Sequence, residues 1–577
     1  MPSQPGRGIP PIAAELELAV QQGRHHHLTS LMNAAIDEIG AGPYQLIVLL
    51  FGGGVYMAEG SFLLMLSIVA KSLIVKWDLS PWAAGAMASV LFGGLLVGTI
   101  TGGFACDHYG RRRPILVTYL GISAFTIIGI MAPGLLLLLV AKFMLGFCLG
   151  FGVPAANAIV AESCPPAHRS NVYCMTMVLF SLGQLYSATI VWVMSPTLHH
   201  QEMEWRVMLA VATILPMVLL VLAYIFLRES PHWLMLNCRV TEARNVVTEM
   251  LRYKQLDEDL IKYQDLAEAV SMQLCSPLAS RTKPAQDEYD NGVAGAAESP
   301  DERTALMQKA RHPADELLCC QPAACLSCFL RRWSEFRDNI LFNIGRLGAL
   351  FSPSFRLTTG IMLYVTFASN FAYYGMIYGL PDTLKKAYLN KEGGGWSPAA
   401  GLFLSAVFEI PGVFIAVVLG MTIGRRKNMS FAFFGCAVSL VSTVSALSSH
   451  QITESVGLLS VLGVKLFLAT GYIIVYLYLL ECYPTKFRAT GLAFCMVLGR
   501  LGAAVCPFLY DGLAFLFVED VCFFLIMSAM MAGASVACCF LPYETKDAVL
   551  EEDAPPGTCT PVRDVSLLTR RTNGTSD

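Results

Sequence analysis

Long apolar runs recur along most of this chain, and they limit its possible folds more than any other feature. Each run is about 20 residues long, which is the length that an α-helix needs to cross a lipid bilayer. Hydrophobic residues make up 55% of the 577 positions and charged residues only 14%. A soluble protein of this size could not bury so much apolar surface, so we predict an all-α, multi-pass membrane protein.

The apolar runs fall into two groups on either side of a long polar segment. Each group holds six of the twelve predicted transmembrane helices, at approximately 44–72, 82–106, 114–132, 134–161, 171–195 and 205–228, and then at approximately 356–381, 397–422, 428–449, 455–481, 490–511 and 519–541. The chain accordingly divides into five predicted parts: a disordered N-terminal tail (1–43), an N-terminal six-helix bundle (44–228), a central insert (229–352), a C-terminal six-helix bundle (353–541) and a C-terminal tail (542–577).

The polar stretch 102–114 fixes the predicted orientation of these helices. Its three arginines, Arg111 to Arg113, cannot lie in hydrocarbon, so the stretch is predicted to form a short aqueous hairpin. Loops rich in Lys and Arg face the cytoplasm, and further basic residues fall on the side of this hairpin: Arg169, Arg425, Arg426, Lys427, Lys486 and Arg488. The opposite side carries a smaller set, in which Lys71 and Asp382 are loop charges. We therefore expect the insert and both termini to be cytoplasmic.

The central insert is predicted to combine helical and disordered segments. An amphipathic helix begins near Thr241, and the stretch at about 276–316 has the polar composition of a disordered chain. Apolar residues recur every three or four positions from Trp333 to Phe351, as in a helix that lies in the membrane interface. Zinc binding, palmitoylation and unmodified thiols all remain open for the cysteine cluster before it, which consists of Cys319, Cys320, Cys325 and Cys328.

The two groups of predicted helices repeat each other in sequence. The Gly-Arg-Arg triplet at 110–112, after the second span, returns at 424–426 after the eighth span. A Glu-x-x-Pro-x-x-x-Arg motif occurs at 162–169 and again at 481–488. Two six-helix halves related by such a parallel repeat indicate the major facilitator architecture, with a substrate site between the halves near the middle of the membrane.

Several motifs resemble those of the major facilitator superfamily. The pattern Gly103-x-x-x-Asp107-x-x-Gly110-Arg111-Arg112 is similar to its shared loop motif, and residues 228–234 and 542–546 are similar to motifs that follow the sixth and last spans. Narrower features are similar to the SVOP-like and organic cation/anion transporter branch; they lie at 371–375, 409–412, 483–491 and 500–502.

This resemblance implies a charged latch at the cytoplasmic ends of the helices. Asp107 would face the start of the eleventh span, and Arg111 and Arg112 would meet Glu162. Met421 stands where the second half would place its aspartate, so only the first half is expected to form the full network. The predicted gating residues are Gly103, Asp107, Gly110, Arg111, Arg112, Glu162, Arg169, Arg425, Arg426, Glu481 and Arg488.

Some ionisable side chains are predicted to lie inside the spans, where an unpaired charge costs at least ~3 kcal/mol. Glu59, Glu409 and Arg500 lie near the middle of spans one, eight and eleven. Glu409 and Arg500 either neutralise each other or serve the substrate, and Glu59 is expected to carry a proton or to contact the substrate. Lys142 in span four either binds an anion or extends its side chain to the outer surface, and the second alternative is slightly favoured. Lys465 lies at a comparable level of span ten.

The seventh span carries a polar aromatic face. Tyr374 and Tyr378 are one helical turn apart, Asn370 lies one turn before Tyr374, and Tyr373 is adjacent. Such a face suits a flat organic molecule held by stacking or cation–π contact, or an aromatic belt at the membrane surface. Gln184 in span five is a weaker candidate, which binds substrate or a neighbouring helix.

These features predict a secondary active transporter of a small organic ion that works by alternating access, coupled to a proton or another ion gradient. The two acids slightly favour a cation. A hexose porter of the same superfamily and a non-transporting receptor or scaffold on this fold are the alternatives. We expect a monomer in the plasma membrane or a vesicle membrane, with no enzymatic activity, cofactor, metal site or nucleic-acid partner; the net charge is −3, and no nucleotide-binding loop motif is present.

Overall fold

The computed structural model describes residues 36–545 except for 38, 166–168, 196, 199–203, 238, 255–349, 354, 390–396, 449–453, 484, 518–520 and 543. The predicted N-terminal and C-terminal tails lie almost entirely outside the described residues. The same holds for the cysteine cluster, the predicted disordered stretch of the insert and nearly all of its interfacial helix. The helices described below belong to one compact unit, which comprises Met1–Tyr263 and Phe351–Asp577.

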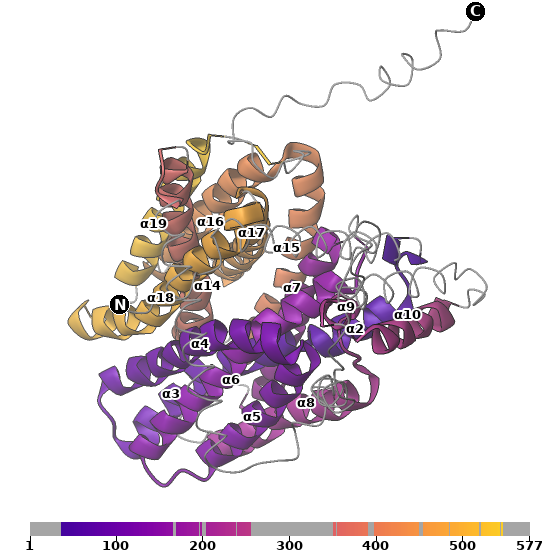
Figure 1. The fold of residues 1–577 in the computed structure, drawn as a ribbon. Coiled ribbons are helices and arrows are strands. Elements are labelled where there is room, and N and C mark those ends of the chain that lie inside the picture. Colours follow the sequence, from indigo (N-terminus) through magenta and orange to yellow (C-terminus); the bar gives the residue numbers. More distant parts are fainter. Residues whose placement is uncertain are drawn as a thin grey trace, which may run out of the picture. The chain divides into compact units, whose positions relative to one another are not determined.

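The described part of the chain is built from α-helices (Figure 1). The first half contains α2 (Pro43–Gly52), α3 (Gly54–Trp77), α4 (Pro81–Tyr109), α5 (Arg112–Ile130), α6 (Leu135–Glu162), α7 (Arg169–Met194) and α8 (Trp205–Phe226), followed by α9 (Pro231–Leu236) and α10 (Val240–Lys254). The second half contains α14 (Arg356–Leu389), α15 (Pro398–Ile423), α16 (Arg425–Ser448), α17 (Glu454–Glu481), α18 (Thr485–Phe517) and α19 (Val521–Cys539).

Eleven helical segments among the described residues are long and apolar enough to cross a membrane, with α2 and α3 together forming the first. The predicted seventh span corresponds to α14, which is 34 residues long but is not among the eleven. Its sequence carries many polar residues, including Thr366, Ser369 and Asn370, all of which are buried. Burial against other helices explains how α14 tolerates polar groups that lipid would not. The predicted all-α membrane fold is confirmed.

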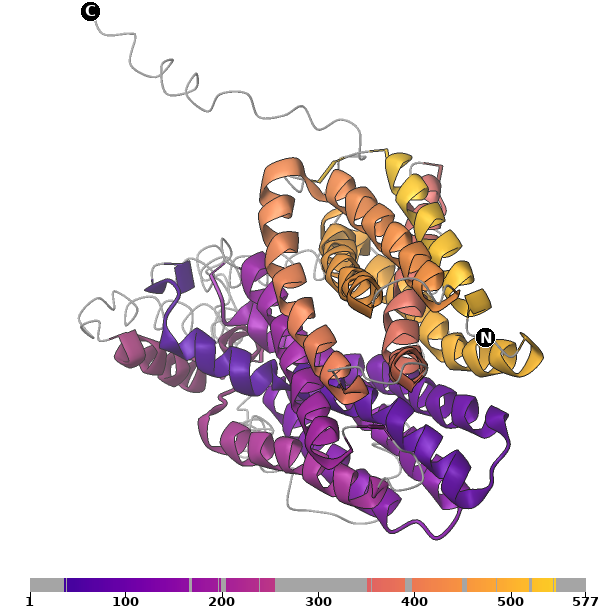
Figure 2. The same ribbon diagram turned by 180° about the vertical axis from the view of Figure 1, so that it is seen from behind.

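The same four helix pairings occur in both halves. In the first half α3 packs on α7, α4 on α6, and α5 on both α6 and α8. In the second half the corresponding pairs are α14 on α18, α15 on α17, and α16 on both α17 and α19. The two groups of helices are coloured indigo to magenta and orange to yellow in Figure 2. This correspondence confirms in three dimensions the repeat that the sequence motifs predict.

Glycines permit the closest helix contact in the first half. A Cβ atom on Gly146 or Gly150 of α6 would lie 2.0 or 2.1 Å from the backbone oxygen of Leu91 or Leu95 on α4. No side chain fits such a space, so the backbones of α4 and α6 touch directly.

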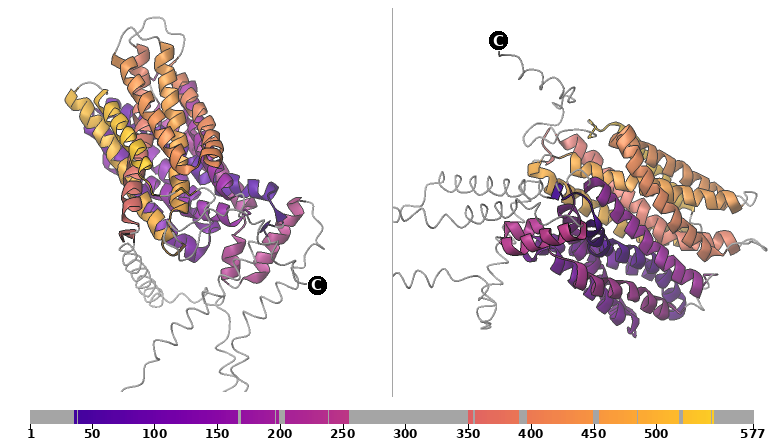
Figure 3. Two further views of the ribbon diagram at one scale, coloured as in Figure 1. Left: turned by 90° about the horizontal axis from the view of Figure 1, so that it is seen from above. Right: turned by 90° about the vertical axis from the view of Figure 1, so that its right-hand side faces the viewer.

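The two halves meet through a small set of helices. α4 packs on α18, α7 packs on α15, and α3 contacts α14. These helices are seen from two further directions in Figure 3. Polar and charged residues on α3, α7, α14, α15, α17 and α18 can therefore meet across the boundary between the halves, and they form the candidate site.

Candidate functional site

A buried ion pair joins the two halves at the predicted mid-membrane level. Glu59 on α3 is 1% exposed and Arg500 on α18 is 4% exposed. The Arg500 Nη1 lies 3.1 Å from the Glu59 Oε1. Arg500 also donates a hydrogen bond to the Tyr374 hydroxyl, and the Tyr374 ring centroid is 5.6 Å from the guanidinium carbon. We call Glu59 and Arg500 the central pair.

The Arg500 guanidinium holds more donors than this pair uses. Its Nε is buried and has no hydrogen-bond partner among the described residues. A guanidinium can donate from five N–H groups, and the contacts with Glu59 and Tyr374 both use Nη1, which leaves the Nε edge free. Tyr472 and Tyr476 of α17 lie close enough to interact with Arg500 electrostatically. Arg500 is therefore positioned to bind a further acceptor.

A second buried cluster also crosses between the halves. The Glu409 Oε2 on α15 lies 3.3 Å from the Lys465 Nζ on α17 and accepts a hydrogen bond of 2.8 Å from the Gln184 Nε2 on α7. Lys465 donates to the Gln184 Oε1 at 3.1 Å, and Tyr373 donates its hydroxyl proton to Glu409. We call Gln184, Tyr373, Glu409 and Lys465 the glutamine cluster. Its one acid and one base neutralise each other, as buried charges require.

Aromatic rings connect the central pair with the glutamine cluster. Tyr373 and Tyr374 meet edge to face with ring centroids 5.5 Å apart, and Tyr373 stacks on Tyr472 at 4.6 Å. Asn370, one turn earlier on α14, donates from Nδ2 to the Tyr476 hydroxyl at 3.0 Å. The structure thus brings Asn370, Tyr373 and Tyr374 together in a buried aromatic group, which is a suitable surface for stacking a flat ring or for contact with a cation.

A third cluster joins the halves at their predicted outer end. The Lys71 Nζ on α3 lies 2.7 Å from the Asp511 Oδ1 on α18 and 3.1 Å from the Asp382 Oδ2 on α14. The Tyr378 hydroxyl donates to the Asp511 Oδ2 at 2.8 Å, and the ring centroids of Tyr378 and Tyr510 lie 5.6 and 5.2 Å from the Lys71 Nζ. We call Lys71, Asp382 and Asp511 the outer cluster.

The first predicted cytoplasmic latch lies within the N-terminal half. Gly110 has φ = 91°, a conformation that glycine adopts without strain, and α5 follows it closely. The Arg111 guanidinium donates to both carboxylate oxygens of Glu162, from Nη2 at 2.8 Å and from Nε at 3.0 and 3.2 Å. Glu229 accepts from the backbone amides of Arg111 and Arg112 and so caps α5. Burial lowers the pKa of the Arg111 guanidinium, but Glu162 outweighs burial and raises that pKa overall, so Arg111 stays protonated.

Two details of the predicted latch differ from expectation. The Arg112 Nη2 donates to the backbone oxygen of Tyr224 at 2.7 Å, and Arg112 makes no ion pair with Glu162 among the described residues. Asp107 lies 3.6 Å from Arg111, and its side chain is 82% exposed. The predicted contact between Asp107 and the start of α18 falls outside the described residues, because the side chains of 485–489 are left out. A Cβ on Gly103 would meet nothing within 4 Å, so close packing does not explain this glycine.

The C-terminal half contains the matching latch. The Arg425 Nη2 lies 3.1 Å from the Glu481 Oε1, and Glu544 accepts from the backbone amides of Arg425 and Arg426. Met421, at the position of the missing aspartate, is exposed. The side chains of Arg169 and Arg488 lie outside the described residues.

Three predictions about individual candidates are wrong or need refinement. Glu409 and Arg500 do not neutralise each other, because Glu409 pairs with Lys465 and Arg500 with Glu59. Lys142 is only 5% exposed, so its side chain does not extend to the outer surface. Tyr378 donates its hydroxyl proton to Asp511 of the outer cluster and is not part of the central aromatic group, although it shares a helix face with Tyr374.

Sequence reasoning missed several residues that the structure brings together. The sequence places Lys71 and Asp382 among the loop charges of the side opposite the hairpin, whereas their side chains are only 17% and 18% exposed. Asp511 ends an apolar run, and an acid in that place is a usable signal for a buried partner. For Tyr472 and Tyr476, the sequence offers no sign of a role in the site beyond their spacing of one turn in an apolar helix.

The comparisons with known proteins agree with this architecture. The family model described as "Sugar (and other) transporter" matches residues 57–284 and 339–554. The chain is 24% identical to an organic cation/carnitine transporter 7 of Arabidopsis thaliana, over 91% of this chain and 97% of the relative. It is also 24% identical to a synaptic vesicle 2-related protein of Xenopus laevis, over 91% of this chain and 83% of the relative, which confirms the resemblance to the SVOP-like branch.

Solved structures support the fold. An inward-open structure of the xylose transporter XylE from E. coli matches with a TM-score of 0.57 and 16% identity, over 88% of this chain and 98% of that chain. A partially occluded inward-open structure of the same transporter matches with a TM-score of 0.58. At this level of identity the likeness concerns the arrangement of helices and not the substrate.

Proposed function

We propose that this chain, which belongs to the Sugar (and other) transporter family, is a secondary active transporter of a small organic ion that carries a carboxylate. Membership of this family makes the chain a multi-pass membrane transporter of a small molecule and not an enzyme. The substrate class, the coupling and the role of each site residue are the content of the proposal.

The free edge of Arg500 is the observation that carries the proposal. A buried guanidinium nitrogen without a partner costs free energy, so a site that retains one has a use for it. A carboxylate binds the Nε edge of arginine through two parallel hydrogen bonds, a geometry that hydroxyl groups of a sugar do not reproduce with the same charge assistance. Tyr374 beside the guanidinium supplies an apolar ring face for the rest of the molecule.

The charges of the site refine the preference for a cation. That preference rested on Glu59 and Glu409, but the structure sets Arg500 and Lys465 against them at 3.1 and 3.3 Å. The four charges sum to zero, so an ion that bears both a carboxylate and a cationic nitrogen matches them as well as an anion does. The name of the Arabidopsis relative, organic cation/carnitine transporter 7, supports an ion over a sugar.

The position of these pairs supports alternating access. Glu59 and Gln184 belong to the first half, whereas Arg500, Glu409 and Lys465 belong to the second. A substrate carboxylate that binds Arg500 competes with Glu59 for the same cation, and so it weakens a contact that joins the halves. Glu59, released from Arg500 in an apolar setting, is then the acid best placed to take up a proton.

A binding screen with matched ligand pairs tests the proposal. Nicotinate and nicotinamide differ in one group, which is a carboxylate in the first and an amide in the second. A carnitine-like betaine and choline share a trimethylammonium group, but only the betaine carries a carboxylate. A hexose represents the sugar alternative. A ligand that binds only the folded protein raises the thermal unfolding temperature of the purified chain. We expect stabilisation by the carboxylate member of each pair and none by the partner that lacks the carboxylate. Stabilisation by the hexose alone would contradict the proposal and favour a sugar porter.

Variants of Arg500 and Glu409 separate the roles of these two residues. Arg500→Gln should abolish the stabilisation by the carboxylate ligand, whereas Glu409→Gln should change its affinity without removing it. If Arg500→Gln binds the ligand as the wild type does, the carboxylate is recognised elsewhere and the proposed site is wrong.

A further inference from the structure

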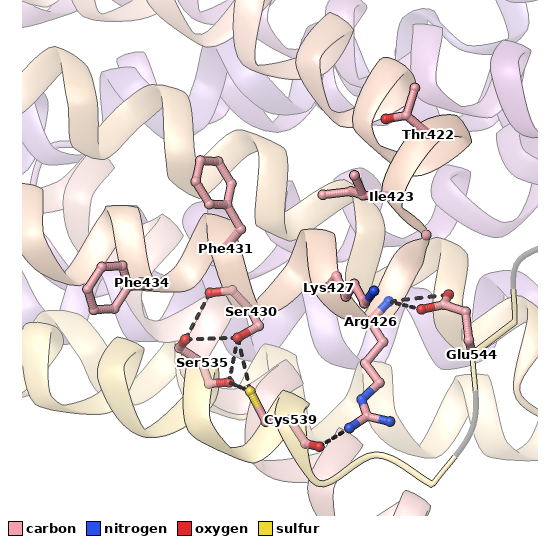
Figure 4. Close-up of a pocket in the computed structure, with 11 residues that line it drawn as sticks. Thr422, Ile423, Arg426, Lys427, Ser430, Phe431, Phe434, Ser535, Cys539 and Glu544 are labelled. Atoms are coloured by element: carbon pink, nitrogen blue, oxygen red, sulfur yellow. Dashed lines mark hydrogen bonds between the residues drawn. The ribbon is translucent and has the colours of Figure 1, made fainter.

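A groove opens at the predicted cytoplasmic end of the C-terminal half, away from the candidate site. Its volume is about 770 Å³, and it lies between the end of α15, the start of α16 and the end of α19 (Figure 4). None of its residues belongs to the central pair, the glutamine cluster or the outer cluster.

The groove has a basic part and an apolar part. Arg426 and Lys427 lie in the first turn of α16, and Figure 4 shows Phe431 and Phe434 further along the same helix. The two rings are 52% and 61% exposed. Residues 427, 431 and 434 share one face of the helix, because they are four and three residues apart. A positive charge above a lipid-facing apolar wall matches the polarity of a phospholipid.

The basic side chains retain donors for a ligand. The Arg426 guanidinium uses Nη2 to donate to the backbone oxygen of Cys539, and no other bond from that guanidinium occurs among the described residues. Lys427 is exposed, and its ammonium makes no ion pair in the part of the chain that the structure describes. Glu544 faces the backbone amides of Arg425 and Arg426, so the acid in this groove is already engaged.

The equivalent place in the N-terminal half is built differently. There the Arg112 Nη2 donates to the backbone oxygen of Tyr224, as Arg426 does to Cys539. The Tyr224 ring then covers Arg112, with its centroid 5.8 Å from the guanidinium carbon. Cys539 has no ring, so it leaves Arg426 uncovered.

Small residues widen the groove further. Ser430 stands four residues after Arg426, and Ser535 stands four residues before Cys539. The matching positions of the first half, counted from Arg112 and Tyr224, hold Leu116 and Leu220. Ser430, Ser535 and Cys539 bond to one another along the floor of the groove (Figure 4). Smaller side chains at three positions therefore account for a hollow in this half.

We propose that this groove binds an anionic phospholipid, with the phosphate between Arg426 and Lys427 and an acyl chain along Phe431 and Phe434. Two bases against the single engaged acid Glu544 leave a net positive charge, which complements the phosphodiester. Location in a membrane supplies the lipid, and the interfacial position of the basic residues brings them to the level of its headgroup.

Thermal unfolding of the purified full-length chain with added lipid tests the proposal. We expect phosphatidylglycerol to stabilise the protein and phosphatidylcholine with the same acyl chains to have little effect. Lys427→Gln should raise the phosphatidylglycerol concentration that gives half of the stabilisation by about fivefold. One basic residue near the membrane surface contributes on the order of a fivefold gain in affinity for an anionic lipid. Arg113→Gln makes the same charge change in the first half and should leave the effect unaltered.

Two filling variants separate the groove from general surface charge. Cys539→Tyr and Ser535→Leu keep both basic residues but restore the bulk found in the first half, and either should remove most of the phosphatidylglycerol effect. Three outcomes would overturn the proposal: equal losses in Lys427→Gln and Arg113→Gln, full lipid binding by both filling variants, or equal stabilisation by inorganic phosphate at the same concentration. If one filling variant fails to fold, the lipid response of the other variant tests the proposal.

Discussion

The ion pairs at the two ends of the molecule differ in what they connect. The outer cluster joins Lys71 of the first half to Asp382 and Asp511 of the second. The two cytoplasmic latches, Arg111 with Glu162 and Arg425 with Glu481, each stay inside one half. Both kinds have similar distances, between 2.7 and 3.1 Å, so geometry alone does not distinguish them.

The difference lies in which motion each pair opposes. A pair inside one half moves with that half as a rigid body and stabilises its fold in every state. A pair between halves must break when the halves separate at that end, so it sets the equilibrium between conformations. We therefore expect the motif at the predicted cytoplasmic end to act as an internal brace of each half. We expect the contacts that oppose separation to lie at the predicted outer end and at mid-membrane.

The largest effect is expected from breaking the central pair. Glu59→Gln leaves Arg500 buried without a counter-charge, which lowers the unfolding free energy by about 3–5 kcal/mol. The variant also lacks the proposed proton carrier, so we expect uptake to be lost. Uptake into proteoliposomes measures the loss. The double variant Glu59→Gln/Arg500→Gln removes both charges and should recover the folding stability but not transport. Unchanged uptake and pH dependence in the single variant would exclude a role for Glu59 in coupling.

Breaking the outer cluster should shift the conformational equilibrium. Lys71→Gln leaves Asp382 and Asp511 without their cation, and a loss of about 2 kcal/mol favours the outward-open state by roughly 30-fold. Labelling of a cysteine introduced at the outer end of α4 measures the change as a faster reaction. Lys76→Gln is the matched control, since Lys76 pairs with Glu204 of its own half at 3.3 Å. Equal labelling rates in the two variants would remove the distinction between cross-half and internal pairs.

Breaking a cytoplasmic latch should affect stability and not the equilibrium. Glu162→Gln weakens three hydrogen bonds from Arg111, and we expect a loss of about 1–3 kcal/mol in unfolding free energy. Thermal unfolding measures it, and the outer labelling rate should stay at the wild-type value. Glu481→Gln should behave in the same way in the second half. A large change in labelling with little change in stability would mean that the latch does gate transport.

The smallest effect is expected at Asp107. Its carboxylate is 82% exposed and 3.6 Å from Arg111, which is typical of a surface pair worth less than about 1 kcal/mol. Asp107→Asn should therefore leave both stability and labelling nearly unchanged. A clear increase in labelling from the cytoplasmic side would restore the original interpretation of Asp107 as a gate residue.

Much of the fold could be predicted from the sequence because membrane helices can be recognised by the length and the apolar composition of their segments. The repeat of the 110–112 and 424–426 triplets gave the two halves, and their corresponding helix pairings follow it. The long polar helix α14 was also found, although its composition falls short of an ordinary span.

The pairing of the buried charges could not be predicted in the same way. Glu59 and Arg500 are 441 positions apart, and their contact depends on how α3 and α18 are rotated about their axes. Adjacent residues illustrate the limit, since Tyr373 bonds Glu409 whereas Tyr374 bonds Arg500. The free-energy cost of burying a charge indicates that the charge has a partner, but it does not identify that partner. From the sequence alone, Glu409 and Arg500 are therefore as plausible a pair as any other.

Uptake of a matched ligand pair into proteoliposomes tests the central claim most directly, namely that the Arg500 edge binds a substrate carboxylate. The wild-type protein should take up the carboxylate member, such as nicotinate, and should reject its amide. Arg500→Gln should lose that discrimination together with the uptake. Wild-type transport of the amide or of a hexose, with the carboxylate ignored, would contradict the account.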